Sequence, residues 1–154
     1  MKTLEWKLYE TEDEAILTLF YGMGLLYGTR CNYNQDIIYD RHFVSNYYWH
    51  GDEETTPLHK ELIRLCGKPD LTVLLKASVS TRMNRIYTRN HQDKDLSNCA
   101  MYDDGYGKME NFLQNFDFNY IVIDTEYLSP EEVADIVMQN IELMNSKKLL
   151  KERK

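Results

Sequence analysis

The segment LTVLLKASVSTRMNRIYT, residues 71–88, decides the fold class. Its first five residues, Leu71 to Leu75, form a short and almost wholly apolar run, which is the pattern of a buried strand in a parallel sheet. Residues 78–88 then change to a helical pattern. A buried strand that leads directly into a helix is the repeating unit of α/β folds, so we expect a parallel sheet covered by helices.

The same alternation of strand and helix continues on both sides of this segment. We expect buried strands at residues 36–40 (DIIYD) and 119–124 (NYIVID), and a half-buried or edge strand at 3–9. The expected helices, which show apolar residues at helical spacing, span about residues 12–28, 57–66, 106–115 and from 130 onward. The sequence therefore predicts an α/β three-layer sandwich with a mostly parallel sheet.

The last helix has the clearest start. Ser129 can cap it, Pro130 occupies the first helical position, and Glu132 stands at the third position of a capping box. The apolar residues that hold one face of this helix are Val133, Ile136, Val137, Ile141 and Met144.

Residues 89–104, RNHQDKDLSNCAMYDD, show no clear apolar period and carry many polar groups. This pattern predicts a mobile loop, and loops of this kind often form lids over active sites. We expect the lid region to span about residues 82–104, because the helix before the loop would belong to it.

The composition indicates one globular domain over residues 1–154, since a chain of this length with 43% hydrophobic residues can bury a single core. The formal net charge of −7 argues against a nucleic-acid partner, because nucleic-acid binders usually carry a basic stripe. Small anionic ligands need only a few local cations and remain compatible with this charge.

The cysteines Cys31, Cys66 and Cys99 are odd in number and far apart, so we expect free thiols rather than disulfides or a protein-built metal site. No segment has the roughly 18 consecutive apolar residues of a membrane span, and the acidic N-terminus does not resemble a signal peptide. We therefore expect a cytoplasmic protein without a membrane partner.

Parallel sheets bind ligands at the C-terminal ends of their strands, which directs attention to Asp40 and Arg41 after the expected strand 36–40. An arginine can hold a phosphate with two parallel hydrogen bonds, and an aspartate can hold a metal-bound water or orient a hydroxyl. The alternative interpretation of the pair is a surface salt bridge that caps the strand.

Residues 37–49, IIYDRHFVSNYYW, resemble the DRYxxSxxAYQ signature of thymidylate kinases and are similar to the DRS-type element of deoxynucleoside kinases. Residues 69–90, PDLTVLLKASVSTRMNRIYTRN, are similar to the family pattern PDLTxYLDVxPExxLxRIxxR and its arginine-rich lid helix. Residues 119–137, NYIVIDTEYLSPEEVADIV, resemble the last strand and helix of the family. The three matches occur in the family's order, and the similarity covers roughly residues 12–143.

The resemblance implies a kinase that moves the γ-phosphoryl group of ATP, with Mg²⁺, onto a nucleoside or a nucleoside monophosphate. Asp40 and Arg41 match the acid and arginine beside the phosphates, and Ser45 matches the serine of the signature. Tyr47, Tyr48 and Trp49 lie where the family places residues around the acceptor base, although core packing would explain them equally well. The resemblance also implies a homodimer as one arrangement of the protein.

Arg82, Arg85 and Arg89 recur at steps of three and four residues, which places them on one face of a helix. Three cations there would suit a triphosphate whose charge grows on oxygen during transfer. Arg85 and Arg89 match the lid arginines of the family, and a solvated basic face is the alternative interpretation.

The chain departs from the family pattern in three ways. His42 stands where thymidylate kinases usually carry Tyr or Phe, which leaves the acceptor open. The segment LTLFYGMGLLYGTR, residues 17–30, lacks the arginine of LFAADR-like versions, for which Arg30 could substitute. The sequence contains no phosphate-binding string GxxxxGK[ST], and we interpret the glycine cluster Gly22, Gly24 and Gly28 as a site of close helix packing.

In the family the phosphate-binding loop follows a first strand at the centre of the sheet, so we expect this chain to begin at the second strand. Without that first strand, the strands at 36–40 and 71–75 would keep unpaired edges, and the chain alone should be marginal or rearranged. We therefore expect little turnover from this chain, and a non-catalytic nucleotide-binding or subunit-interaction module is the alternative function. A structural α/β domain without a ligand is the third.

Overall fold

The computed structural model describes residues 11–31, 36–93, 95–101 and 105–152, except for the side chains at 98, 100, 101 and 147–152. The elements follow in this order: α2 (Glu14–Cys31), α3 (Phe43–His50), α4 (Thr56–Cys66), β1 (Thr72–Lys76), α5 (Val79–Arg89), α6 (Asp95–Met101), α7 (Gly105–Asn115), β2 (Tyr120–Asp124) and α8 (Pro130–Glu152). The expected strand at 3–9 lies outside the described residues.

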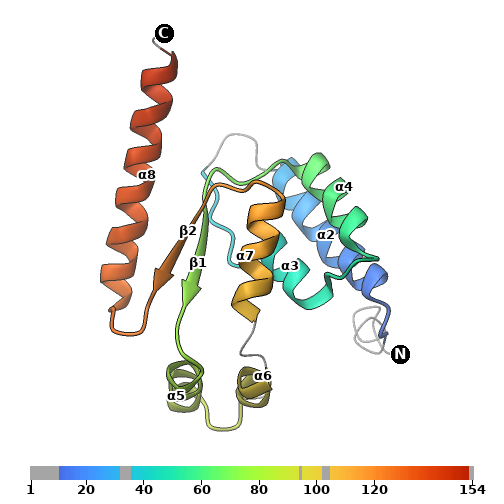
Figure 1. Ribbon diagram of the computed structural model, residues 1–154, viewed down its shortest axis with the longest axis vertical. Helices are drawn as coiled ribbons and strands as arrows, with labels where there is room; N and C mark the ends of the chain where they lie inside the picture. The colour runs from blue at the N-terminus through green and yellow to red at the C-terminus, as the bar shows by residue number, and fades with distance from the viewer. Residues whose placement is uncertain (1–10, 32–35, 94, 102–104, 153–154) are drawn as a thin grey trace. The chain divides into compact units, whose positions relative to one another are not determined.

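The described part of the chain is a mostly helical α/β structure with a small sheet. Strands β1 and β2 pair in parallel, with Thr72 opposite Tyr120 and Lys76 opposite Asp124. Figure 1 shows the two strands side by side and pointing in the same direction. Both strands lie within one residue of the predicted positions, and their parallel pairing is confirmed.

The predicted strand at residues 36–40 is wrong. Residues 36–39 have no regular structure, residue 40 lies in a bend, and the side chain of Ile38 is 98% exposed. A strand needs a neighbour to complete its ladder of backbone hydrogen bonds, and among the described residues only β1 and β2 form such a ladder. An apolar run was therefore not sufficient to make a strand.

The loop predicted at 89–104 contains a helix, so this prediction needs correction as well. Helix α6 occupies Asp95–Met101, and its start is held by Asp93, whose carboxylate accepts a hydrogen bond from the Asp95 N–H at 3.0 Å. Among the described side chains of this helix, Cys99 is buried. A helix of seven residues is too short to show a clear period in the sequence.

Helix α2 packs on α3 and α4 through its smallest residues. Thr18 and Gly22 are buried, and a Cβ atom added to Gly22 would collide with the side chain of Leu62 in α4. A Cβ added to Gly28 would lie 2.8 Å from the Tyr39 hydroxyl, whereas one at Gly24 would meet no atom. Close helix packing is thus confirmed at Gly22, whereas Gly28 lies against Tyr39 of the irregular segment 36–39.

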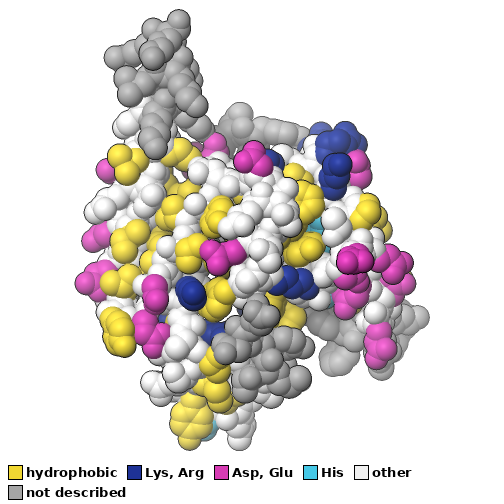
Figure 2. All heavy atoms as spheres, viewed as in Figure 1, with side chains coloured by type: hydrophobic (Ala, Val, Ile, Leu, Met, Phe, Trp, Pro, Cys, Tyr) yellow, Lys and Arg dark blue, Asp and Glu magenta, His cyan; other side chains and the backbone are white. Residues whose placement is uncertain are grey.

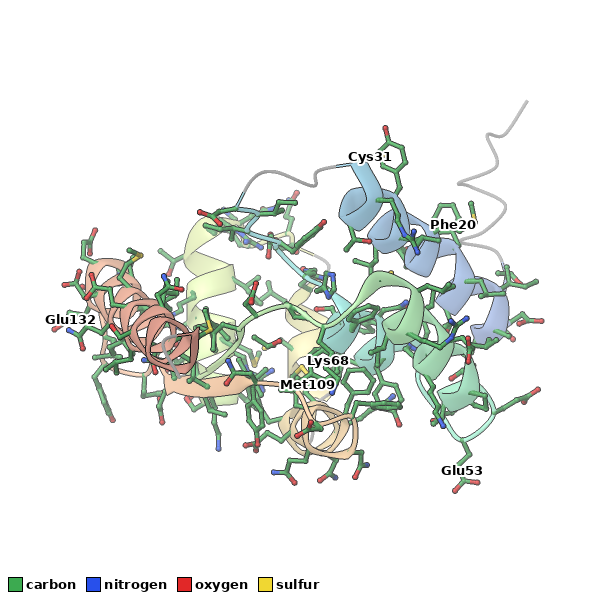
Figure 3. The ribbon with its side chains drawn as sticks, turned by 90° about the horizontal axis from the view of Figure 1, so that it is seen from above. Phe20, Cys31, Glu53, Lys68, Met109 and Glu132 are labelled. Atoms are coloured by element: carbon green, nitrogen blue, oxygen red, sulfur yellow. The ribbon has the colours of Figure 1, made fainter. Side chains whose placement is uncertain are left out.

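The apolar residues from which the helix at 12–28 was predicted lie mainly on the side of α2 opposite to Thr18 and Gly22. Met23 and Tyr27 are 68% and 73% exposed, and Phe20, which Figure 3 labels, is 36% exposed. Figure 2 shows hydrophobic side chains among the charged ones on the face that it views.

Helix α8 begins with the predicted capping box. The Ser129 hydroxyl accepts a hydrogen bond from the Glu132 N–H at 3.2 Å, and the Glu132 carboxylate accepts one from the Ser129 N–H at 2.7 Å. This reciprocal pair satisfies two backbone donors that a helix start would otherwise leave unpaired. The predicted apolar face of α8 is half-buried.

The chain forms two compact units, Met1–Pro69 with Gly107–Phe118 and Asp70–Tyr106 with Asn119–Lys154. The core of the first contains Phe43, Phe112 and Leu113, which are at most 1% exposed. The second buries Leu74 of β1 and Ile123 of β2. Among the described helices, none has the length and apolar content that crossing a membrane requires.

Candidate functional site

The predicted Asp40-Arg41 pair lies in a bend that leads into α3. Arg41 has a φ of 70°, which places a residue with a side chain in the left-handed region of backbone space. This conformation costs roughly 1–2 kcal/mol for an L-residue, because the Cβ atom comes too close to a carbonyl oxygen. Strain of this kind gathers at functional sites, where the surrounding structure holds it in place.

Asp40 and Arg41 are both exposed, and neither side chain forms an ion pair or hydrogen bond with another described residue. The pair also caps no strand, since residues 36–39 are irregular. An exposed carboxylate and an exposed guanidinium that are neighbours in the chain can receive a ligand that carries both a hydroxyl and a phosphate.

His42 supports this bend from inside the first unit. Its ring lies 4.8 Å from the Tyr39 ring and 4.3 Å from the Phe43 ring, centroid to centroid. Burial lowers the pKa of His42 from 6.5 to about 4, so the ring is neutral at pH 7. The buried Nδ1 atom of His42 and the hydroxyl of Tyr39 have no hydrogen-bond partner among the described residues.

The other residues that were predicted to bind the phosphoryl acceptor lie on α3. Ser45 is half-buried in the first turn, and its N–H donates to the His42 carbonyl at 3.1 Å. Trp49 is 42% exposed, with its ring 4.7 Å from that of Tyr48 in an edge-to-face arrangement. Tyr47 is different, because it packs on Phe112 at 4.5 Å as part of the core.

Lys108 holds the end of this aromatic helix and was not predicted. Its ammonium group donates a hydrogen bond of 2.9 Å to the Tyr48 carbonyl and lies 5.5 Å from the centre of the Tyr47 ring. Burial lowers the pKa of Lys108, while Asp52 and Glu14 act in the opposite direction. No sequence signal marks this lysine, because its partners lie 60 residues away along the chain.

Arg30, which could have replaced the arginine missing from the family pattern, has a structural partner. Its guanidinium donates a hydrogen bond of 3.1 Å to the Leu65 carbonyl near the end of α4.

In the second unit, Arg85 joins α5 to the residue after β2. Its guanidinium donates to the Thr125 hydroxyl at 2.9 Å and to the Thr125 carbonyl at 2.5 Å. Thr125 in turn donates its hydroxyl and its N–H to the carbonyl of Lys76, at 3.0 and 2.7 Å. Arg85 therefore lies at the C-terminal ends of both strands.

Arg82 and Arg89 lie at the two ends of the same helix. The Arg82 guanidinium carbon is 5.4 Å from the centre of the Tyr106 ring, a cation–π contact. Arg89 forms an exposed ion pair of 2.7 Å with Asp93. The eight predicted residues thus form two groups, with Asp40, Arg41, Ser45, Tyr48 and Trp49 in the first unit and the three arginines in the second.

Glu126 is a further residue of this region that the sequence did not reveal. Its carboxylate accepts hydrogen bonds from the Ser78 N–H, the Ser78 hydroxyl and the Thr81 hydroxyl at 2.5 to 2.9 Å. These bonds lower the pKa of Glu126, the one from the Thr81 side chain most, and they fasten the start of α5 to the turn after β2. A lone glutamate after a strand gives no pattern to recognise.

No group of three or more His, Cys, Asp or Glu side chains that could hold a metal ion occurs within the described ranges. Mg²⁺ in nucleotide sites needs fewer protein ligands, because it usually keeps several waters and takes one or two carboxylates together with the substrate phosphates. The exposed Asp40 carboxylate, which has no ion-pair partner among the described residues, fits this requirement.

Comparisons with known proteins identify the family of this chain. A family model described as thymidylate kinase matches residues 7–137. A cytidylate kinase from Sulfolobus acidocaldarius is 31% identical over 83 residues, which cover 49% of this chain and 46% of that protein. No solved structure shows a significant match. The chain belongs to the thymidylate kinase family of nucleotide kinases.

Proposed function

We propose that this chain is the acceptor-binding and charge-stabilising part of a kinase that transfers the γ-phosphoryl group of ATP to a nucleoside or nucleoside monophosphate. Family membership supports the reaction class. The two exposed charges of Asp40 and Arg41, held on a strained backbone, support the position of the acceptor site.

The conformation of Arg41 is the observation that carries the proposal. A surface arginine without a role could relax to an ordinary backbone conformation, or be replaced by glycine, at no cost in contacts. Here the left-handed residue is an exposed arginine next to an exposed carboxylate that has no ion-pair partner in the described part of the chain. Arg41 would hold the acceptor phosphate, and Asp40 would orient the acceptor hydroxyl or a water bound to Mg²⁺.

The remaining residues have supporting roles. Ser45, Tyr48 and Trp49 on α3 would bind the acceptor, the aromatic rings through its base. Arg82, Arg85 and Arg89 would bind phosphate oxygens of ATP and oppose the charge that develops during transfer. Asp40 would help to hold Mg²⁺, which would neutralise phosphate charge during the transfer.

The proposal extends to the setting of the site. A single domain over residues 1–154, completed as a three-layer sandwich, would hold the site, with residues 82–104 as its lid. A homodimer in the cytoplasm is the proposed state, with nucleotides rather than nucleic acid or membranes as partners.

The experiment is a calorimetric titration of the chain with thymidine monophosphate and cytidine monophosphate, repeated for Arg41→Gly. Glycine relieves the backbone strain, so this variant should unfold at the same or a higher temperature. Loss of one charge-assisted phosphate contact should nevertheless weaken monophosphate binding about tenfold or more.

Asp117→Gly is the matched control, because Asp117 is the other described residue with a side chain and a positive φ. It should gain similar stability and bind nucleotides as before. Absence of monophosphate binding by the native chain, or equal binding by Arg41→Gly, would refute the acceptor site.

A second candidate is a nucleotide-binding or subunit-interaction module without catalysis. The hydrogen bonds of Arg85 to Thr125 and the ion pair of Arg89 with Asp93 favour it, because both arginines already have protein partners. A melting temperature that rises with a monophosphate but not with ATP and Mg²⁺ would support the module, whereas phosphoryl transfer by this chain would exclude it.

A further inference from the structure

Two cations meet at one aromatic ring in the second unit. The ammonium group of Lys76, the last residue of β1, lies 5.9 Å from the centre of the Tyr106 ring, and the guanidinium of Arg82 lies 5.4 Å from it. Only Arg82 was expected to contact a ligand. The family pattern quoted above has an aspartate at the position of Lys76, so the cation pair is a feature of this chain.

Tyr106 is fixed at the end of the strand. Its hydroxyl accepts a hydrogen bond of 3.2 Å from the N–H of Ala77, which is buried directly after β1. A phenol that accepts one hydrogen bond still carries a proton that it can donate. Three donors of positive or partly positive charge therefore gather at the C-terminal end of β1, where parallel sheets bind ligands.

The backbone beneath Lys76 is held as well, because its carbonyl accepts both hydrogen bonds from Thr125. Asp124 lies opposite Lys76 in the strand register and could have neutralised it. One oxygen of that carboxylate instead accepts a hydrogen bond of 2.9 Å from the Glu126 N–H, and Asp124 forms no ion pair with Lys76. The carboxylate of Glu126 is occupied by Ser78 and Thr81.

We propose that Lys76, Arg82 and Tyr106 form a phosphate-binding subsite at the end of β1. The ring of Tyr106 contacts both cations, its hydroxyl proton is a third donor, and a phosphate dianion would pair with the cations. This subsite deepens the proposed kinase function, since it adds Lys76 and Tyr106 to the residues that would bind a nucleotide phosphate. The phosphate could belong to ATP or to the monophosphate.

The test uses inorganic pyrophosphate as the probe and the full chain, at constant ionic strength, with calorimetry as the readout. Lys76→Met removes one charge and keeps the length of the side chain, and it should weaken pyrophosphate binding about tenfold. Tyr106→Leu should have a similar effect because both cations lose their platform. Tyr106→Phe keeps the ring and loses the hydroxyl, so about threefold weakening is expected.

Lys60→Met is the matched control, since Lys60 is an exposed lysine of α4 and the same charge is removed. It should change pyrophosphate binding less than twofold. Equal weakening by Lys60→Met and Lys76→Met would overturn the subsite, as would a native chain that does not bind pyrophosphate. Melting curves of Tyr106→Phe and Lys76→Met verify that these variants fold.

Competition identifies the source of the phosphate. Displacement of pyrophosphate by ATP assigns the subsite to the donor, and displacement by thymidine monophosphate assigns it to the acceptor. The proposed function fails on the monophosphate titration with Arg41→Gly, whereas this subsite fails on the pyrophosphate titration with Lys76→Met, so the two failures are distinguishable.

Discussion

His42 gives the first unit a dependence on pH. Burial lowers its pKa from 6.5 to about 4, so the unfolded chain binds more protons than the native one between these values. The free energy of unfolding should therefore fall as the pH drops from about 6.5 to about 4. Burial also lowers the pKa of His59 and adds to the same trend.

The check is urea unfolding of the native chain and of His42→Phe at several pH values from 7 to about 4. Phenylalanine keeps the aromatic packing against Phe43 and cannot titrate. The variant should lose less stability on acidification than the native chain does. Parallel stability curves for the two proteins would show that His42 is protonated in the native state as readily as in the unfolded one.

The sequence identified several residues at this scale but not their environment. Asp40 and Arg41 were predicted from the end of an expected strand and from the family signature, whereas the left-handed backbone at Arg41 has no signal in the residue types. Arg85 was predicted to face a ligand, and its hydrogen bonds to Thr125 depend on a contact 40 residues away along the chain. Partners brought together only by the fold, such as those of Lys108, could not be found from a single sequence.

At the scale of the element, α2 offers a direct test of its packing. Replacing glycine by alanine inside a helix usually stabilises it by roughly 1 kcal/mol. Gly24→Ala should show this gain, since no atom lies near the added methyl group. Gly22→Ala should instead destabilise the chain by about 1–3 kcal/mol, because the methyl group overlaps the buried side chain of Leu62.

Urea unfolding of both variants measures the difference, and each serves as control for the other. Equal stabilisation by the two substitutions would mean that α2 and α4 do not pack closely at Gly22.

The sequence predicted an element best where the residues that stabilise it are close to one another along the chain. The start of α8 was predicted correctly because the partners in its capping box, Ser129 and Glu132, are three residues apart. The apolar run at 36–40 failed as a strand because a strand depends on a neighbour elsewhere in the chain. The α/β class, the parallel pairing of two strands and most helices could thus be predicted, while the size of the sheet could not, and the three-layer sandwich stays a prediction.

At the scale of the whole molecule, two isoleucines from predicted strands differ in burial, because only one of the two strands formed. Ile38 is 98% exposed and Ile123 of β2 is 5% exposed. Ile38→Val should therefore change the free energy of unfolding by less than about 0.5 kcal/mol. Ile123→Val removes a buried methylene and should cost about 0.5–1.5 kcal/mol.

The same denaturation assay serves both variants, which share one chemical change. A loss of more than about 1 kcal/mol in Ile38→Val would mean that residues 36–40 are packed in solution, and the correction to the predicted strand would itself be wrong.

The two compact units are interleaved along the chain, since each is built from two segments separated by part of the other. During synthesis, the first unit therefore lacks its buried Phe112 and Leu113 until the chain has passed through β1, α5 and α6. The second unit is completed even later in synthesis, because β1 has no strand to pair with until β2 has been made. A ribosome-bound nascent chain would thus expose Phe43 and Leu74 until these later segments emerge, a period in which chaperones can bind it.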